Sequence, residues 1–211
     1  MPNWTDNTLT INNLLEEEIQ DLKQVVNNEK LCDFIVPSPD WSNTPNENGE
    51  FPVADKDFPD IRKWSDGTQD LRWYDWNLKH WGTKWGDCDG NTDCVTEGGT
   101  FYYSFQTAWS PLNENFLRAL SLRFPRAEVT LEYLEPNNDF LGASVAQNGE
   151  VLDRCVEFSS LEEEWFEARH KGEVLDEDER EECWYEEQYE FGWEFLGKLS
   201  DELKGALAVA V

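Results

Sequence analysis

Four oxygen-bearing side chains at short spacing are the first candidates for chemistry. They are Asp87, Asp89, Asn91 and Asp93. The first three match positions 1, 3 and 5 of a calcium-binding loop, which takes its ligands from alternate residues. Such a loop needs a glycine at position 6 and a glutamate at position 12, and Thr92 and Gly98 stand there instead. A polar turn is therefore favoured over a metal site, and no cofactor is expected.

A second candidate surface is the run of carboxylates after residue 158. Residues 161–211 contain 17 Asp and Glu against 5 Lys and Arg, whereas the first 160 residues contain 28 against 12. Carboxylates along a helix face can occupy the basic groove of a nucleic-acid-binding protein, and their field speeds association. The alternative is a solvated helix face. The candidate partner-binding carboxylates are Glu162, Glu163, Glu164, Glu167, Asp176, Glu177, Asp178, Glu179, Glu181, Glu182, Glu186, Glu187 and Glu190.

Tryptophans are the third set of candidates. Trp81 and Trp85 flank a short Gly-Thr-Lys turn, and Trp is enriched at protein interfaces. We expect these two side chains to supply aromatic anchors to the same interface. Core packing is the favoured explanation for the wider cluster, which also includes Trp73, Trp76 and Trp109.

Composition excludes several classes of function. The formal charge of −28 disfavours direct binding to nucleic acid or to an anionic membrane surface. Two histidines and no nucleophile motif argue against an enzyme. No apolar run approaches the ~18 residues of a membrane span. Five cysteines without a disulfide-scaffold spacing, and an opening segment unlike a signal peptide, favour a cytoplasmic setting.

The first part of the chain must position these residues. Alternating Leu9 and Ile11 predict a strand over 8–12, and apolar residues at helical spacing predict a helix after it. Leu31–Val36 is predicted to be a second strand. Residues 37–67 hold five of the nine prolines and are predicted to be a loop insertion without regular structure. A helix is predicted over 68–81.

The second part repeats this order. Alternating aromatic residues predict a strand over 101–109, and Ser110-Pro111 is typical of a helix start. That helix is expected to end at Pro125, before a strand around 129–133. Asn148-Gly149 predicts a tight hairpin. The resulting fold class is α+β: a ferredoxin-like antiparallel sheet with helices on one face over residues 1–158, and an acidic helical extension over 159–211 packed on it.

Several pieces of the chain resemble one family. They are MPNWTDNTLTI, HWGTKWGD, FQTAWSPL and RFPRAEVTLEYLEPNNDFLG, in this order. The resemblance is to the Api/YubB-type ferredoxin-like domain proteins of phages and conjugative plasmids, whose function is unknown. It implies a ferredoxin-like fold and a mobile-element source, and it supplies no catalytic residues.

The resulting hypothesis is an acidic, non-enzymatic protein in the host cytoplasm. Its partner would be a basic nucleic-acid-handling host protein or defence complex, which it would inhibit, for example by nucleic-acid mimicry. Two alternatives stay open: a metal-dependent enzyme or factor that uses the Asp87–Asp93 loop, and a structural or assembly module. Steep salt dependence would distinguish mimicry from both.

Overall fold

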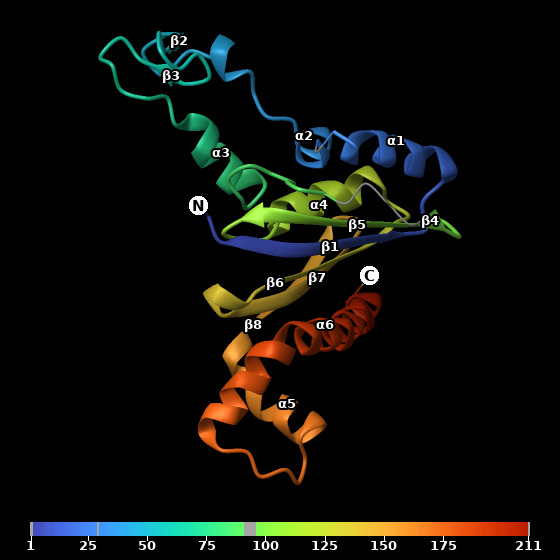
Figure 1. Ribbon diagram of the computed structural model, residues 1–211. Helices are drawn as coiled ribbons and strands as arrows, with labels where there is room; N and C mark the ends of the chain where they lie inside the picture. Colours follow the sequence, from blue (N-terminus) through green and yellow to red (C-terminus); the bar gives the residue numbers. More distant parts are fainter. Residues whose placement is uncertain (1, 29, 91–95, 211) are drawn as a thin grey trace.

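The computed structural model describes residues 2–28, 30–90 and 96–210. A six-stranded antiparallel sheet forms its centre, with strand order β4-β5-β1-β6-β7-β8 (Figure 1). The strands are β1 (Trp4–Asn12), β4 (Thr96–Glu97), β5 (Thr100–Ala108), β6 (Glu128–Glu135), β7 (Phe140–Gln147) and β8 (Glu150–Glu157). Strand β1 is central, so that Leu9 lies opposite Tyr103 of β5 and Leu131 of β6.

The topology is ferredoxin-like with an added edge. The crossover from β5 through helix α4 (Glu114–Arg123) returns to β6 on the far side of β1. Strands β7 and β8 form the predicted hairpin and extend the sheet beyond β6. Asn148 and Gly149 both have positive φ, 49° and 87°, as the tight turn requires. The predicted fold class is therefore confirmed.

The predicted strand over 31–36 is wrong, because Leu31–Ile35 forms helix α2. A short apolar run fits a strand and a buried helical turn equally well. The place of a second ferredoxin strand, at the edge beside β5, is taken by the two-residue strand β4. This strand follows the Asp-rich loop, about 60 residues later than predicted.

Helices α1 (Glu16–Val26), α2 and α4 cover one face of the sheet (Figure 1). Their apolar side chains enclose a core with the inward residues of β1 and β5, such as Leu9 and Phe101. Helix α4 was predicted to begin at Ser110-Pro111, but it begins at Glu114. The Ser110 hydroxyl donates to the Gly82 carbonyl, and the Asn113 side chain caps the helix by accepting from the Phe116 N–H at 3.0 Å.

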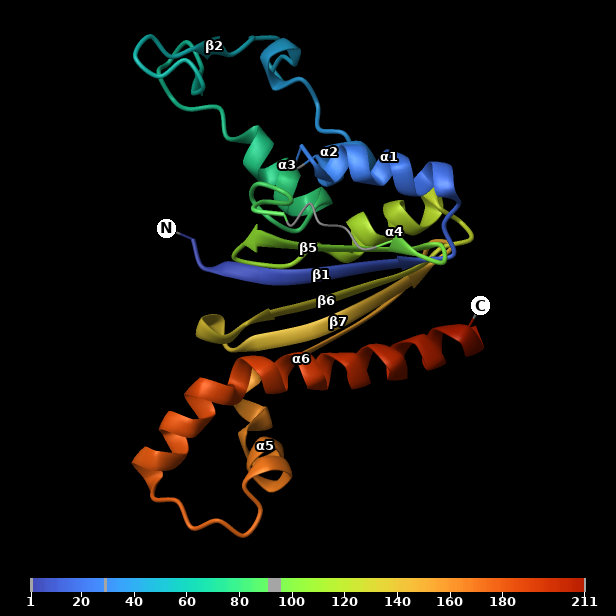
Figure 2. The ribbon, with the colours of Figure 1, turned by 45° about the vertical axis from the view of Figure 1, so that its right-hand side comes forward.

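The opposite face is covered by the end of the chain. A 3₁₀ turn at 136–138 joins β6 to β7. Helix α5 (Glu162–Arg169) follows a second 3₁₀ turn at 158–161, and the long helix α6 (Glu177–Ala210) then crosses the sheet (Figure 2). Leu196, Leu199 and Leu203 of α6 pack on β6 and β7 in a second core. Gly192 allows close approach there, since a Cβ at this position would lie 2.9 Å from the Phe158 ring.

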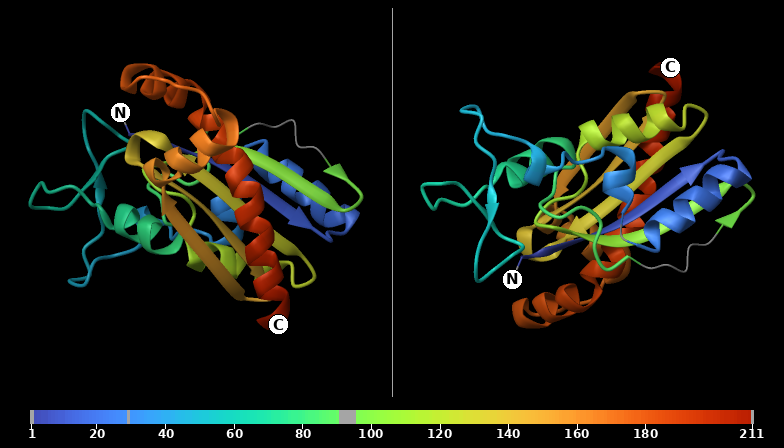
Figure 3. Two further views of the ribbon diagram at one scale, coloured as in Figure 1. Left: turned by 90° about the horizontal axis from the view of Figure 1, so that it is seen from below. Right: turned by 90° about the horizontal axis from the view of Figure 1, so that it is seen from above.

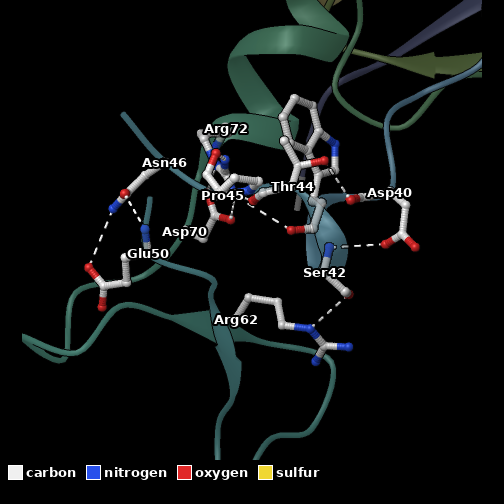
Figure 4. Close-up of polar contacts among 10 residues, drawn as sticks. Asp40, Ser42, Thr44, Pro45, Asn46, Glu50, Arg62, Asp70 and Arg72 are labelled. Atoms are coloured by element: carbon white, nitrogen blue, oxygen red, sulfur yellow. Dashed lines mark hydrogen bonds and ion pairs between the residues drawn. The ribbon is translucent and has the colours of Figure 1, made fainter. Parts of the chain in front are cut away.

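An arm formed by residues 37–71 extends away from the helical face (Figure 1). It is more regular than predicted, with a 3₁₀ turn (Trp41–Asn43) and a small ladder of β2 (Val53–Ala54) and β3 (Arg62–Lys63). The guanidinium of Arg72, at the start of helix α3 (Arg72–His80), organises its base (Figure 4). That group donates to Asp70, Thr44 and Pro45, and it stacks between Trp41 and Trp64. Helix α3 begins at Arg72, four residues later than predicted.

Candidate functional site

The acidic candidates lie on a helical hairpin formed by α5 and the first half of α6. This hairpin projects beyond the sheet (Figure 2). Trp165 holds it together, because its fully buried ring contacts Trp184 at 5.2 Å between centroids and its indole N–H donates to Glu187 at 3.0 Å. The hydrogen bond from Trp165, supported by Arg169, keeps the pKa of Glu187 below its usual value. Glu187 is thus part of the hairpin's own packing.

Two arginines of the hairpin form ion pairs with further candidates. Arg169 pairs with Glu187, Glu190 and Glu194, at 3.2, 3.6 and 2.8 Å. Arg180 pairs with Glu162 at 2.8 Å and with Glu163 at 2.9 Å. These ion pairs join α5 to α6 and offset part of the charge that was predicted to bind a partner, although Glu163 and Glu190 are each 74% exposed.

Three more candidates have local roles. The Asp176 carboxylate accepts from the Glu179 N–H at 2.9 Å, and the Glu179 carboxylate accepts from the Asp176 N–H at 3.1 Å. This reciprocal pair caps α6. Glu167 lies 3.9 Å from the ammonium of Lys171, a weak exposed contact.

The remaining candidates form an outward-facing acidic surface. They are Glu164, Glu177, Asp178, Glu181, Glu182 and Glu186, all exposed. Within the part of the chain that the structure describes, none of the six forms an ion pair. We call the five on α6 the acidic ridge. They span about 13 Å at a rise of 1.5 Å per residue, or about one charge per 3 Å. One strand of B-DNA carries one charge per about 3.4 Å.

The two tryptophan candidates have different environments. Trp81 is 5% exposed and donates its indole N–H to the Val36 carbonyl at 3.0 Å, so it is a core residue and not an interface anchor. Trp85 is 44% exposed and lies 6.1 Å from the Trp109 ring, with the Lys84 ammonium 4.4 Å from its own ring centre. Trp85 remains available at the surface, far along the chain from the acidic ridge.

The Asp-rich loop has a structural role at its first residue. Asp87 is buried, and its carboxylate accepts from the backbone N–H groups of Leu31 and Cys32 and from the Tyr103 hydroxyl, at 3.2, 3.1 and 3.0 Å. Asp89 is exposed, and Asn91 and Asp93 lie outside the described residues. Among the residues described, no three His, Cys, Asp or Glu side chains are grouped to hold a metal. The same residues contain no helix long and apolar enough to cross a bilayer.

Comparison with known proteins places this chain in a family. A family model described as a ferredoxin-like domain in Api92-like proteins matches residues 80–195, more than half of the chain. The chain belongs to this Api92-like family. The matched segment runs from the end of α3 to the middle of α6, so the α5–α6 hairpin falls within it.

One solved structure is similar to this Api92-like protein. It is a protein named Api92 from Yersinia pseudotuberculosis, with 11% sequence identity and a TM-score of 0.43. The similarity covers 74% of this chain and 98% of that one. No protein with a curated description matches.

The fold of this Api92-like protein also brings together residues that sequence reasoning missed. Asp6 of β1 and Tyr189 of α6 are separated by 183 positions, yet the Tyr189 hydroxyl donates to the Asp6 carboxylate. Gln106 of β5 donates to the other oxygen of Asp6 at 2.8 Å. The available signal was the alternation in β1, which turns Asp6 away from the face that carries Leu9 and Ile11.

Proposed function

We propose that this Api92-like protein is a non-enzymatic inhibitor that binds a basic, nucleic-acid-handling host protein in the cytoplasm. In this proposal the acidic ridge of α6 occupies a surface that otherwise binds a nucleic-acid backbone. A restriction or CRISPR-type defence complex is the kind of target that such a ridge fits, and the role would then be anti-defence.

The charge pattern of the ridge is the observation that carries the proposal. The carboxylates of Glu177, Asp178, Glu181, Glu182 and Glu186 are exposed, and no ion pair within the described chain neutralises them. Their number of charges per length of helix axis is close to that of one DNA strand. The hairpin is also fixed by Trp165, so little ordering entropy is lost when the ridge binds.

The salt dependence of partner binding tests the proposal. The tagged protein is used to capture proteins from bacterial lysate at 50 mM and 500 mM NaCl, and captured proteins are identified by mass spectrometry. We expect a basic nucleic-acid-binding protein that is retained at low salt, released at high salt and displaced by double-stranded DNA. Affinity is expected to fall about tenfold or more over this range, because ionic attraction is screened.

A matched pair of variants localises the effect. Asp178→Asn, Glu182→Gln and Glu186→Gln together remove three charges from the ridge, and Glu16→Gln, Glu17→Gln and Asp21→Asn remove three from the exposed part of α1. Only the first triple variant should weaken binding strongly. Equal losses in both, or a partner whose binding is indifferent to salt, would contradict mimicry and favour an assembly module.

A further inference from the structure

Helix α6 leaves half of its sheet face open. It crosses the sheet over β6, β7 and β8, and strands β1 and β5 lie beside it (Figure 3). The outward side chains of these strands, including Thr8, Ser104 and Gln106, are polar and partly exposed. A hollow of about 530 Å³ lies between this open half and α6, and a second of about 480 Å³ lies between the start of β1, residues 135–137 and the first half of α6. Both are lined by Asp6 and Tyr189, and together we call them the α6 groove.

Aromatic rings form much of the wall of the α6 groove. Tyr189 and Trp193 line the first hollow, and Trp4, Trp184 and Tyr185 line the second. Tyr185 is 76% exposed and Tyr189 is 42% exposed. Such rings attract cations through their negatively charged faces, and arginine also stacks on them with its planar guanidinium.

The charged groups of the groove all have one sign. Asp6 and Asp89 line the first hollow, and Glu135 and Glu181 line the second, whereas no lysine or arginine lines either of them among the described residues. Asp6 is held at the centre by Gln106 and Tyr189. A carboxylate has about four acceptor sites, so Asp6 can accept further N–H groups.

We propose that the α6 groove binds an extended, arginine-bearing segment of the basic partner. The inference rests on the proposed function and names the part of the partner that is recognised. Side chains must provide the recognition, because the β1 backbone is already paired with both β5 and β6 and cannot accept another strand. An arginine lies with its guanidinium on the Asp6 carboxylate and against the ring of Tyr189 or Tyr185. A single-stranded nucleic acid fits the rings but not the four carboxylates, which repel its phosphates.

A binding assay with defined peptides tests this groove. The probe is a fluorescein-labelled 12-residue peptide of alternating glycine and arginine, compared with its glycine–lysine counterpart by fluorescence anisotropy on the full chain. We expect the arginine peptide to bind several-fold more tightly than the lysine peptide. Asp6→Asn and Tyr185→Ala should each weaken its binding by about fivefold to thirtyfold.

Matched controls make the result decisive. Asp21→Asn removes the same charge from α1, and Tyr102→Ala removes another exposed tyrosine from the same sheet face without lining the groove. Neither should change binding more than about twofold. If Asp6→Asn unfolds the protein, the exposed Tyr185→Ala variant still tests the proposal. Equal losses in the controls, or tighter binding of oligouridine than of the peptide, would overturn it.

Failure of the groove and failure of the proposed function give different results. If peptide binding depended on Asp178 and Glu182 but not on Asp6 or Tyr185, the peptide would bind to the acidic ridge. That result would contradict the groove inference and leave the proposed function standing. If neither basic peptide binds and no salt-sensitive partner is captured, both fall together.

Discussion

The structural role of Asp87 could not be predicted from its neighbours in the sequence. Its place in a loop between a helix and a strand was predicted, and its alternation with Asp89 suggested a metal ligand. The carboxylate instead caps α2 and receives the Tyr103 hydroxyl, through partners up to 56 positions away. Local spacing contains no information about such distant donors, so only the fold reveals them.

Replacement of Asp87 tests this structural role. Asp87→Asn should lower the free energy of unfolding by about 1–3 kcal/mol, because buried N–H and hydroxyl donors lose a charged acceptor. Urea denaturation followed by tryptophan fluorescence measures the change. Asp89→Asn is the control, and it should leave stability within about 0.5 kcal/mol since Asp89 is exposed.

The effect of calcium on stability tests the alternative that the Asp-rich loop binds a metal. If calcium raised the unfolding midpoint of the original chain and Asp89→Asn removed that increase, the Asp-rich loop would be a cation site. A midpoint that is equal with calcium and with chelator would leave Asp87 with its capping role alone.

At the scale of elements, the sequence predicted those with strong periodicity best. The aromatic alternation of β5 and the Asn148-Gly149 hairpin are as expected. In α6, Leu196, Leu199, Leu203 and Leu207 follow one another at helical spacing and are buried against the sheet. Tyr185, about three turns earlier on the same face of α6, is exposed because this part of the helix lies beyond the sheet. Periodicity shows which face of a helix is apolar, but it does not show how far along the helix the sheet extends.

Helix α6 offers a direct test of its packing through two glycines. Gly192→Ala should lower the free energy of unfolding by about 1–3 kcal/mol, because the added Cβ would meet the Phe158 ring. Gly197→Ala meets nothing within 4 Å and should raise it by up to about 1 kcal/mol, through better helix propensity. Thermal and urea denaturation of the two variants measure the difference.

The opposite signs are what make this pair informative. A stabilising Gly192→Ala would mean that α6 is not seated against Phe158 in solution. A destabilising Gly197→Ala would mean that the helix presents a different face to the sheet.

At the scale of the molecule, charge was the most visible property of the sequence and the hardest to interpret. The total of −28 follows from composition. Composition does not show which carboxylates form ion pairs, because the geometry of the hairpin decides which of them lie near Arg169 and Arg180. Of the thirteen acidic candidates, those on the acidic ridge and Glu164 stay available, and Asp6 was not among the candidates at all.

The net charge has a measurable consequence for stability. Raising NaCl from 10 to 150 mM shortens the Debye length from about 30 to about 8 Å and screens repulsion among the carboxylates. The unfolding midpoint at pH 7 should therefore rise with salt, as measured by calorimetry. Choline chloride at equal ionic strength should have the same effect, and a midpoint that falls in both salts would mean that ion pairs outweigh repulsion.

The order in which the chain builds its sheet bears on how it folds. Strand β1 is synthesised first, but its neighbours β5 and β6 follow about 90 and 120 residues later. Contacts between such distant segments close slowly. Even after β8 is complete, Leu141 and Val145 stay uncovered until α6 arrives. The nascent chain therefore exposes an apolar sheet face until residues 191–207 have been made, and exposed apolar surface of this kind is prone to aggregation and is what chaperones bind.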